Sequence, residues 1–206
     1  ERTTFKDLLN FVYYFISGSI MLSYDIPSLK ILTRSFKDDF AVLAYQKTGA
    51  LLEKMNMSKV AYGLYEKAAK STGHKEVFLS KMGDISVRNK NPESAFEAYR
   101  EAYASNPQDK VVLMKLATLT QTYFPEMVDD SIDYYTQLLE LQPEDSAFIY
   151  YELGHLYLKK EDKINSVSAF RLALEQDKTN PFYHNSLAYA YLKAELFVQW
   201  VLLTKF

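Results

Sequence analysis

Apolar residues recur along the middle of the chain at spacings that predict paired amphipathic helices. Between residues 150 and 158, the apolar or small positions follow the i, i+3, i+4, i+7, i+8 period of one helix face: Tyr150, Leu153, Gly154, Tyr157 and Leu158. A polar break at 159–162 separates this stripe from a second one that includes Phe170. All six prolines lie at or beside inferred helix ends, where a missing backbone N–H is tolerated. The pattern predicts antiparallel helical hairpins and no sheet.

The hairpin pattern repeats along the chain. Large aromatic residues recur with steps of 34, 36 and 35, at Tyr65, Tyr99, Tyr135 and Phe170. Small residues recur in the same register in two series, Gly49, Gly83, Ala117, Gly154 and Ala61, Ala95, Ser131, Ser166. We expect the small residues of the first helix to face those of the second, and the aromatic residue to reach the next hairpin. Because one hairpin cannot bury both of its faces, such units stack into a solenoid.

These series resemble the tetratricopeptide repeat family. The fourth unit shows the family's pattern as Tyr150, Leu153, Gly154, Tyr157, Ser166, Phe170 and Ala173. The third unit departs most from it and carries an insertion around Phe124 and Pro125. The resemblance implies an all-α, right-handed superhelical solenoid of antiparallel helix hairpins, with ten to twelve helices.

The resemblance divides the chain into units. Residues 42–180 contain four repeats, at 42–75, 76–109, 110–146 and 147–180, and residues 181–206 a partial fifth repeat and a C-terminal helix. Residues 1–41 are expected to form a helical pair, either a diverged repeat or a cap, with a break at Pro27.

Both ends of the chain contain apolar runs. The uncharged run Leu8–Leu22 is shorter than the roughly 20 residues that span a bilayer, and we expect a buried helix there rather than a retained anchor or an interface. The run Leu196–Phe206 predicts either a last helix packed on the fifth hairpin or a surface that associates with another molecule.

Composition excludes several classes of function. The 206 residues carry a net charge of −2, which argues against a general nucleic-acid binder. There is no cysteine, so disulfides, thiolate zinc sites and cysteine nucleophiles are excluded. The three histidines lack a metal-ligand spacing, and the sequence has no glycine-rich phosphate loop. We therefore expect no catalytic residues, no metal and no cofactor.

The resemblance also implies where a ligand binds, because the first helix of each repeat lines the concave groove. The cationic residues at groove positions are Lys47, Lys54, Lys81, Arg88, Lys115 and Lys159. The aromatic and imidazole side chains at groove positions are Phe148, Tyr151, His155 and Tyr189, with Phe182 and Leu158 beside them. Of these residues, we expect Lys81, Arg88, Lys115 and Tyr151 to point away from the helix–helix contacts. The alternative is that the cations form a solvated face and the aromatic residues pack between helices.

These observations predict a non-catalytic scaffold that binds a protein or peptide segment, acidic and with an apolar anchor. The alternative is a helical interaction domain cut from a larger enzyme or from a secretion or assembly machine. It is favoured by the first residue, Glu1, and by the apolar C-terminus. A third possibility is self-association through the apolar ends. The compartment stays open between the cytoplasm and the bacterial periplasm.

Overall fold

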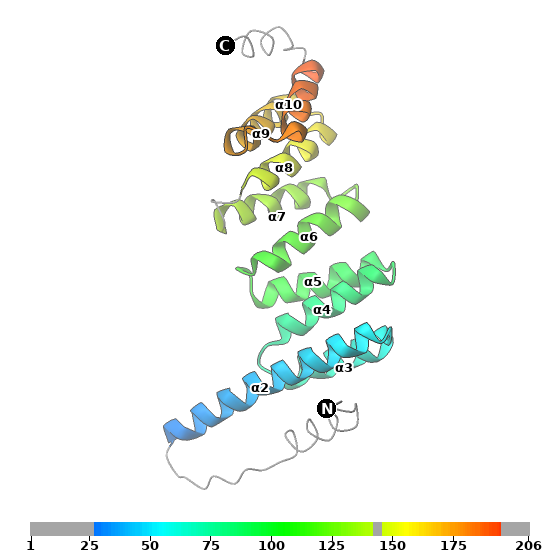
Figure 1. Cartoon of the computed structure of the whole chain (residues 1–206), viewed down its shortest axis with the longest axis vertical. Helices are drawn as coiled ribbons and strands as arrows, with labels where there is room; N and C mark the ends of the chain where they lie inside the picture. Colours follow the sequence, from blue (N-terminus) through cyan, green and yellow to red (C-terminus); the bar gives the residue numbers. More distant parts are fainter. Residues whose placement is uncertain (1–26, 142–145, 195–206) are drawn as a thin grey trace. The chain divides into compact units, whose positions relative to one another are not determined.

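The computed structural model describes residues 27–141 and 146–194, with side chains from residue 38 onward. Every regular element in these ranges is an α-helix, which confirms the all-α prediction (Figure 1). The helices are α2 (Pro27–Lys54), α3 (Ser58–Ser71), α4 (Lys75–Arg88), α5 (Pro92–Ser105), α6 (Lys110–Tyr123), α7 (Val128–Leu141), α8 (Ala147–Lys159), α9 (Lys163–Gln176) and α10 (Pro181–Lys193). The apolar runs Leu8–Leu22 and Leu196–Phe206 lie outside the described residues.

The chain divides into two compact units, residues 1–91 and residues 92–206. In the first unit, α3 packs against both α2 and α4. In the second unit, each helix from α5 to α10 packs against the next one along the chain (Figure 1). Neighbours in sequence are thus neighbours in space within each unit, as expected for stacked hairpins.

Helix α2 is longer than the sequence parse implies. It runs without interruption from Pro27 to Lys54, so the parsed boundary between residues 41 and 42 falls inside it. No Pro or Gly occurs between Pro27 and Gly49, and nothing in the intervening backbone therefore interrupts the helix. Pro27 begins the helix, where its fixed φ angle is favourable.

The turns that follow α2, α4 and α8 share one backbone feature. Asn56, Lys90 and Glu161 adopt left-handed φ angles of 60°, 58° and 60°, and each lies two residues after the end of its helix, α2, α4 or α8. The third hairpin instead turns through residues 124–127, where the sequence shows the insertion. The Phe124 ring packs 5.5 Å from the ring of Phe96 in α5.

The aromatic residue of the second helix fills the space above the glycine of the first. A Cβ atom at Gly154 would lie 2.6 Å from the Phe170 ring, and one at Gly49 would overlap the Tyr65 ring. Both rings are fully buried. The sequence reading placed Ala61 opposite Gly49, but the nearest atoms belong to Tyr65. Tyr65 also reaches Phe78 of α4, 6.1 Å away between ring centres, as expected for contact with the next hairpin.

The two glycines of α2 and α3 provide a matched test of this contact. Helix propensity favours alanine over glycine by about 1 kcal/mol at either position. A Cβ at Gly63 meets nothing within 4 Å, so Gly63→Ala should raise the free energy of unfolding by up to about 1 kcal/mol. Gly49→Ala should lower it by about 1–3 kcal/mol, because the added Cβ would overlap the ring of the fully buried Tyr65. Urea denaturation of both variants measures the difference, and equal effects would contradict the packing described.

Candidate functional site

Three first helices of the second unit, α6, α8 and α10, start at well-defined places. Asp109 caps α6 by accepting from the backbone N–H of Val111 at 2.9 Å. Asn180 caps α10 by accepting from the N–H of Phe182 at 3.0 Å, and Pro181 occupies its first turn. Ser146, just before α8, is buried and accepts a hydrogen bond from the Gln176 amide of α9. The first two contacts set where α6 and α10 begin, and the third joins the start of α8 to α9.

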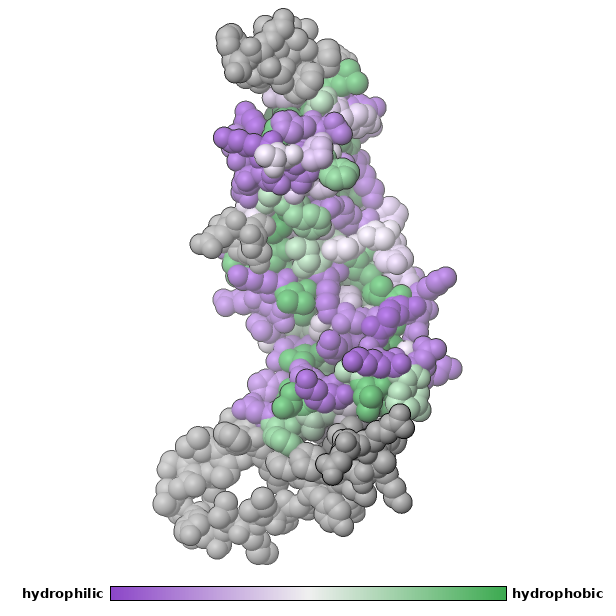
Figure 2. Space-filling model, viewed as in Figure 1, coloured by the Kyte–Doolittle hydropathy of each residue, from purple (hydrophilic) through white to green (hydrophobic). Residues whose placement is uncertain are grey.

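One face of these helices exposes large apolar side chains. The exposed fractions are 61% for Val111, 48% for Phe148, 67% for Phe182, 50% for Tyr189 and 58% for Leu192. Val111, Phe148 and Phe182 each stand second in their helix, at equivalent positions. We call this surface the aromatic face; its members are Val111, Phe148, Tyr151, His155, Leu158, Phe182, Tyr189 and Leu192. Figure 2, which shows one side of the molecule, has separate hydrophobic patches bordered by hydrophilic side chains on the second unit.

Two members of the aromatic face are held in place by rings beneath them. The Tyr151 ring centre lies 4.6 Å from that of His155 and 5.1 Å from that of Tyr183. The His155 ring in turn lies 5.0 Å from the Phe170 ring. Tyr151 and His155 are half-buried. The expectation that Tyr151 points away from helix–helix contacts is therefore wrong, because its ring joins α8 to α10. The His155 ring joins α8 to α9.

Burial changes the acid–base behaviour of His155. Loss of solvent around the imidazole lowers its pKa below the usual value, and the nearby Glu152 carboxylate opposes that shift. Glu152 is also engaged in a hydrogen bond, since it accepts from the Gln121 amide at 2.6 Å. The Gln121 carbonyl accepts from the buried Tyr135 hydroxyl at 2.9 Å. A polar chain thus joins α7, α6 and α8 beside the aromatic face.

The predicted basic residues of the first unit differ in their surroundings. Lys47, Lys54 and Lys81 are exposed. Arg88 instead forms an ion pair with Glu53, whose other oxygen accepts from the Tyr65 hydroxyl at 2.7 Å. Arg88 therefore joins α4 to α2 and α3.

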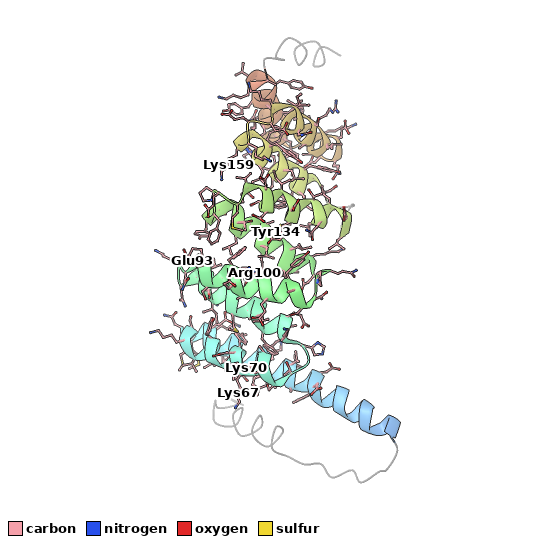
Figure 3. The ribbon with its side chains drawn as sticks, turned by 180° about the vertical axis from the view of Figure 1, so that it is seen from behind. Lys67, Lys70, Glu93, Arg100, Tyr134 and Lys159 are labelled. Atoms are coloured by element: carbon pink, nitrogen blue, oxygen red, sulfur yellow. The ribbon has the colours of Figure 1, made fainter. Side chains whose placement is uncertain are left out.

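In the second unit, Lys159 is exposed at the end of α8 (Figure 3). Lys115 is half-buried, with its ammonium group 5.5 Å from the centre of the Tyr99 ring. Of the predicted groove cations, Lys81 and Arg88 belong to the first unit and Lys115 to the second. A row of cations that continues from one unit to the other therefore stays a prediction.

A pocket of about 360 Å³ opens at one edge of the aromatic face. It is lined by Leu158, Glu161, Lys163, Tyr189 and Lys193. The Lys193 ammonium group lies 5.5 Å from the centre of the Tyr189 ring, a favourable cation–π geometry. The pocket therefore combines apolar walls with two exposed cations, Lys163 and Lys193.

Sequence reasoning missed three contributors to this region: Val111, Tyr183 and Leu192. Val111 occupies the same repeat position as Phe148, and Leu192 the same position as Leu158. Applying the repeat register to every unit would therefore have identified both. Tyr183 is buried beneath Tyr151, a contact that no spacing along one helix predicts.

Among the described residues, no group of His, Cys, Asp and Glu could hold a metal ion. Likewise, none of the helices described is long and apolar enough to cross a membrane.

Comparisons with known proteins identify the repeat. The tetratricopeptide repeat family model matches residues 149–180, which contain most of α8 and all of α9. The resemblance of this hairpin to the family is thereby confirmed. No curated protein matches the sequence.

Solved structures share the fold. Residues 41 to the end of MamA from Desulfovibrio magneticus RS-1 superpose with a TM-score of 0.65 at 15% identity, covering 75% of this chain and 86% of that one. YrrB, described as a TPR protein with an unusual peptide-binding site, superposes with a TM-score of 0.60 at 18% identity, covering 87% and 90%. A tetratricopeptide repeat protein from Parabacteroides merdae gives 0.66 at 16%, covering 73% and 59%. At these identities the likeness concerns the fold, which is that of tetratricopeptide repeat solenoids.

The lowered pKa of His155 predicts a pH-dependent stability. As pH falls below the usual histidine pKa of about 6.5, the unfolded chain binds a proton at His155 before the folded protein does. The free energy of unfolding should therefore decrease as pH falls from that value toward the lowered pKa. His155→Phe should remove this contribution while keeping a ring in contact with Tyr151. Urea denaturation between pH 7.5 and 5.5 measures the free energy of unfolding of the wild type and of the variants. The control is His184→Gln, at an exposed histidine. If the free energy of unfolding of His155→Phe varies with pH as that of the wild type does, His155 is not the source of the pH dependence.

Proposed function

We propose that this chain is a non-catalytic scaffold that binds a protein or peptide segment on the aromatic face of α6, α8 and α10. The observation that carries the proposal is the row of large apolar side chains in repeat register, each about half or more exposed. Exposed apolar surface bordered by polar residues is typical of interaction sites. Aromatic anchors of this kind contribute a large share of binding energy in protein interfaces.

The fold supports this proposal. Stacked hairpins leave a continuous surface formed by equivalent helices, and such surfaces serve as binding surfaces in solenoid proteins. The peptide-binding site that the description of YrrB mentions belongs to a protein with 18% identity to this chain. We carry over from it only the class of ligand, a polypeptide segment.

The cations give the proposed ligand a charge preference. Lys159, Lys163 and Lys193 are exposed around the C-terminal ends of α8 and α10. Arg88 and Lys115 make contacts within the protein, so we assign ligand carboxylates mainly to the first three lysines. Lys47, Lys54 and Lys81 belong to the first unit, and their part in binding stays a prediction. The alternative of a domain from a larger enzyme or machine also remains open, and it is compatible with the same binding face.

Capture from an extract of the native organism tests the proposal. Phe148→Ala combined with Tyr189→Ala should reduce recovery of the bound protein and weaken its affinity at least about tenfold, since two aromatic anchors are lost. Ile164→Ala combined with Leu172→Ala is the matched control, because both residues are exposed apolar side chains of α9. The control should leave recovery unchanged. Equal recovery by the two double variants would rule out the aromatic face as the binding surface.

A further inference from the structure

We infer that His155 is a positioning residue for ligand binding on the aromatic face, and that its neutral imidazole is the form that supports binding. This inference rests on the proposed function and adds a regulation of the same site, namely weaker binding as pH falls. It follows from the place of the imidazole between a ring of the surface and a ring of the core.

The His155 side chain connects the binding surface to the hydrophobic core. Its ring centre lies 4.6 Å from that of Tyr151 on the same helix and 5.0 Å from that of Phe170 in α9. Both contacts are edge-to-face, with interplanar angles of 81°, a favourable arrangement for aromatic rings. Phe170 is fully buried, whereas Tyr151 and His155 are half-buried. The position of Tyr151 at the surface therefore depends on the imidazole beside it.

Tyr151 is the ring through which this contact reaches a ligand. Its ring centre also lies 5.8 Å from that of Phe170 and 5.1 Å from that of Tyr183. These neighbours cover part of the ring and leave the rest exposed on the aromatic face. A ligand that packs on the exposed part also removes solvent from the half-buried His155 next to it.

Two charged side chains lie on the same helix as His155. Glu152 is three residues before it and Lys159 four residues after it, so each is about one turn away. The Glu152 carboxylate favours a charged imidazole, and a lysine four residues away disfavours it, because like charges at this spacing repel each other. The Glu152 carboxylate also accepts a hydrogen bond from the Gln121 amide of α6.

The neighbouring helices direct neutral groups toward this part of α8. Phe170 of α9 contacts the imidazole itself, and the phenol of Tyr183 in α10 lies behind Tyr151. From α7, the Tyr135 hydroxyl donates to Gln121, which in turn binds Glu152. Burial among these groups lowers the pKa of His155 in spite of the Glu152 carboxylate.

The sign of the pH dependence follows from these surroundings. A ligand over Tyr151 and His155 removes further solvent from the imidazole, so the complex takes up a proton less readily than the free protein. Affinity therefore falls as pH drops through the range in which the free protein takes up that proton. One linked proton limits the change in affinity to about tenfold per pH unit.

An uncharged dye tests this coupling. N-phenyl-1-naphthylamine is aromatic and stays neutral between pH 7.5 and 5.0, so its own charge does not affect the result. Its affinity for the full chain, measured by fluorescence, should weaken by about threefold or more as pH falls over this range. His155→Phe keeps a ring beside Tyr151 but cannot take up a proton, and it should lose most of this pH dependence. His184→Gln, at an exposed histidine of α10, should show the pH dependence of the wild type.

Two further variants show where the dye binds and what the imidazole contributes. Phe148→Ala with Tyr189→Ala should weaken dye binding at least about tenfold at pH 7.5, since two aromatic anchors are lost. His155→Ala removes the ring that supports Tyr151, so it should bind the dye more weakly than His155→Phe does at pH 7.5. Circular dichroism at each pH checks that every variant keeps its helices, because unfolding would also change dye binding.

Three results would overturn the inference. They are a pH dependence of dye binding that is the same in His155→Phe as in the wild type, wild-type affinity that does not fall with pH, and dye affinity that Phe148→Ala with Tyr189→Ala leaves unchanged. The proposed function fails on a different result, namely unchanged capture of the native partner by the Phe148→Ala and Tyr189→Ala variant.

Discussion

The close contact between a ring on the second helix and a glycine on the first sets the geometry of the hairpins. Tyr65 covers Gly49 and Phe170 covers Gly154, and in both cases a Cβ atom would collide with a fully buried ring. Glycine inside a helix costs about 1 kcal/mol relative to alanine, so the packing gain must exceed that cost. The contact also positions polar groups, since the Tyr65 hydroxyl reaches Glu53, which in turn binds Arg88.

The same ring packing connects the core to the surface that we propose as the binding site. Phe170 lies beneath His155, and His155 and Tyr183 support Tyr151. These rings restrict the positions that α8 and α10 can take relative to each other. Phe182 and Tyr189 then stand exposed on a supported helix, which lowers the conformational entropy lost when a ligand binds.

The protein uses its cations in two ways. Arg88 and Lys115 interact with Glu53 and Tyr99 within their own units, and they help to hold helices together. Lys159 and Lys193 are exposed beside apolar side chains, where they can interact with carboxylates of a partner. A series of lysines and arginines at repeat spacing in the sequence therefore contains both residues that make contacts within the protein and residues that are exposed. Only the neighbours of each residue distinguish the two.

The sequence by itself determined the helices, the repeat and the positions of the turns, because these follow from local periodicity, proline and the recurring small and aromatic residues. It also placed Phe148, Tyr189 and Lys159 on equivalent helices. The tertiary structure decided what each of these residues meets: Tyr65 rather than Ala61 above Gly49, Glu53 beside Arg88, and Tyr183 beneath Tyr151. The continuous helix Pro27–Lys54 was likewise not evident from the repeat register. Such contacts join residues on different helices, and a spacing along one chain specifies a helix face without specifying which side chain of another helix fills it.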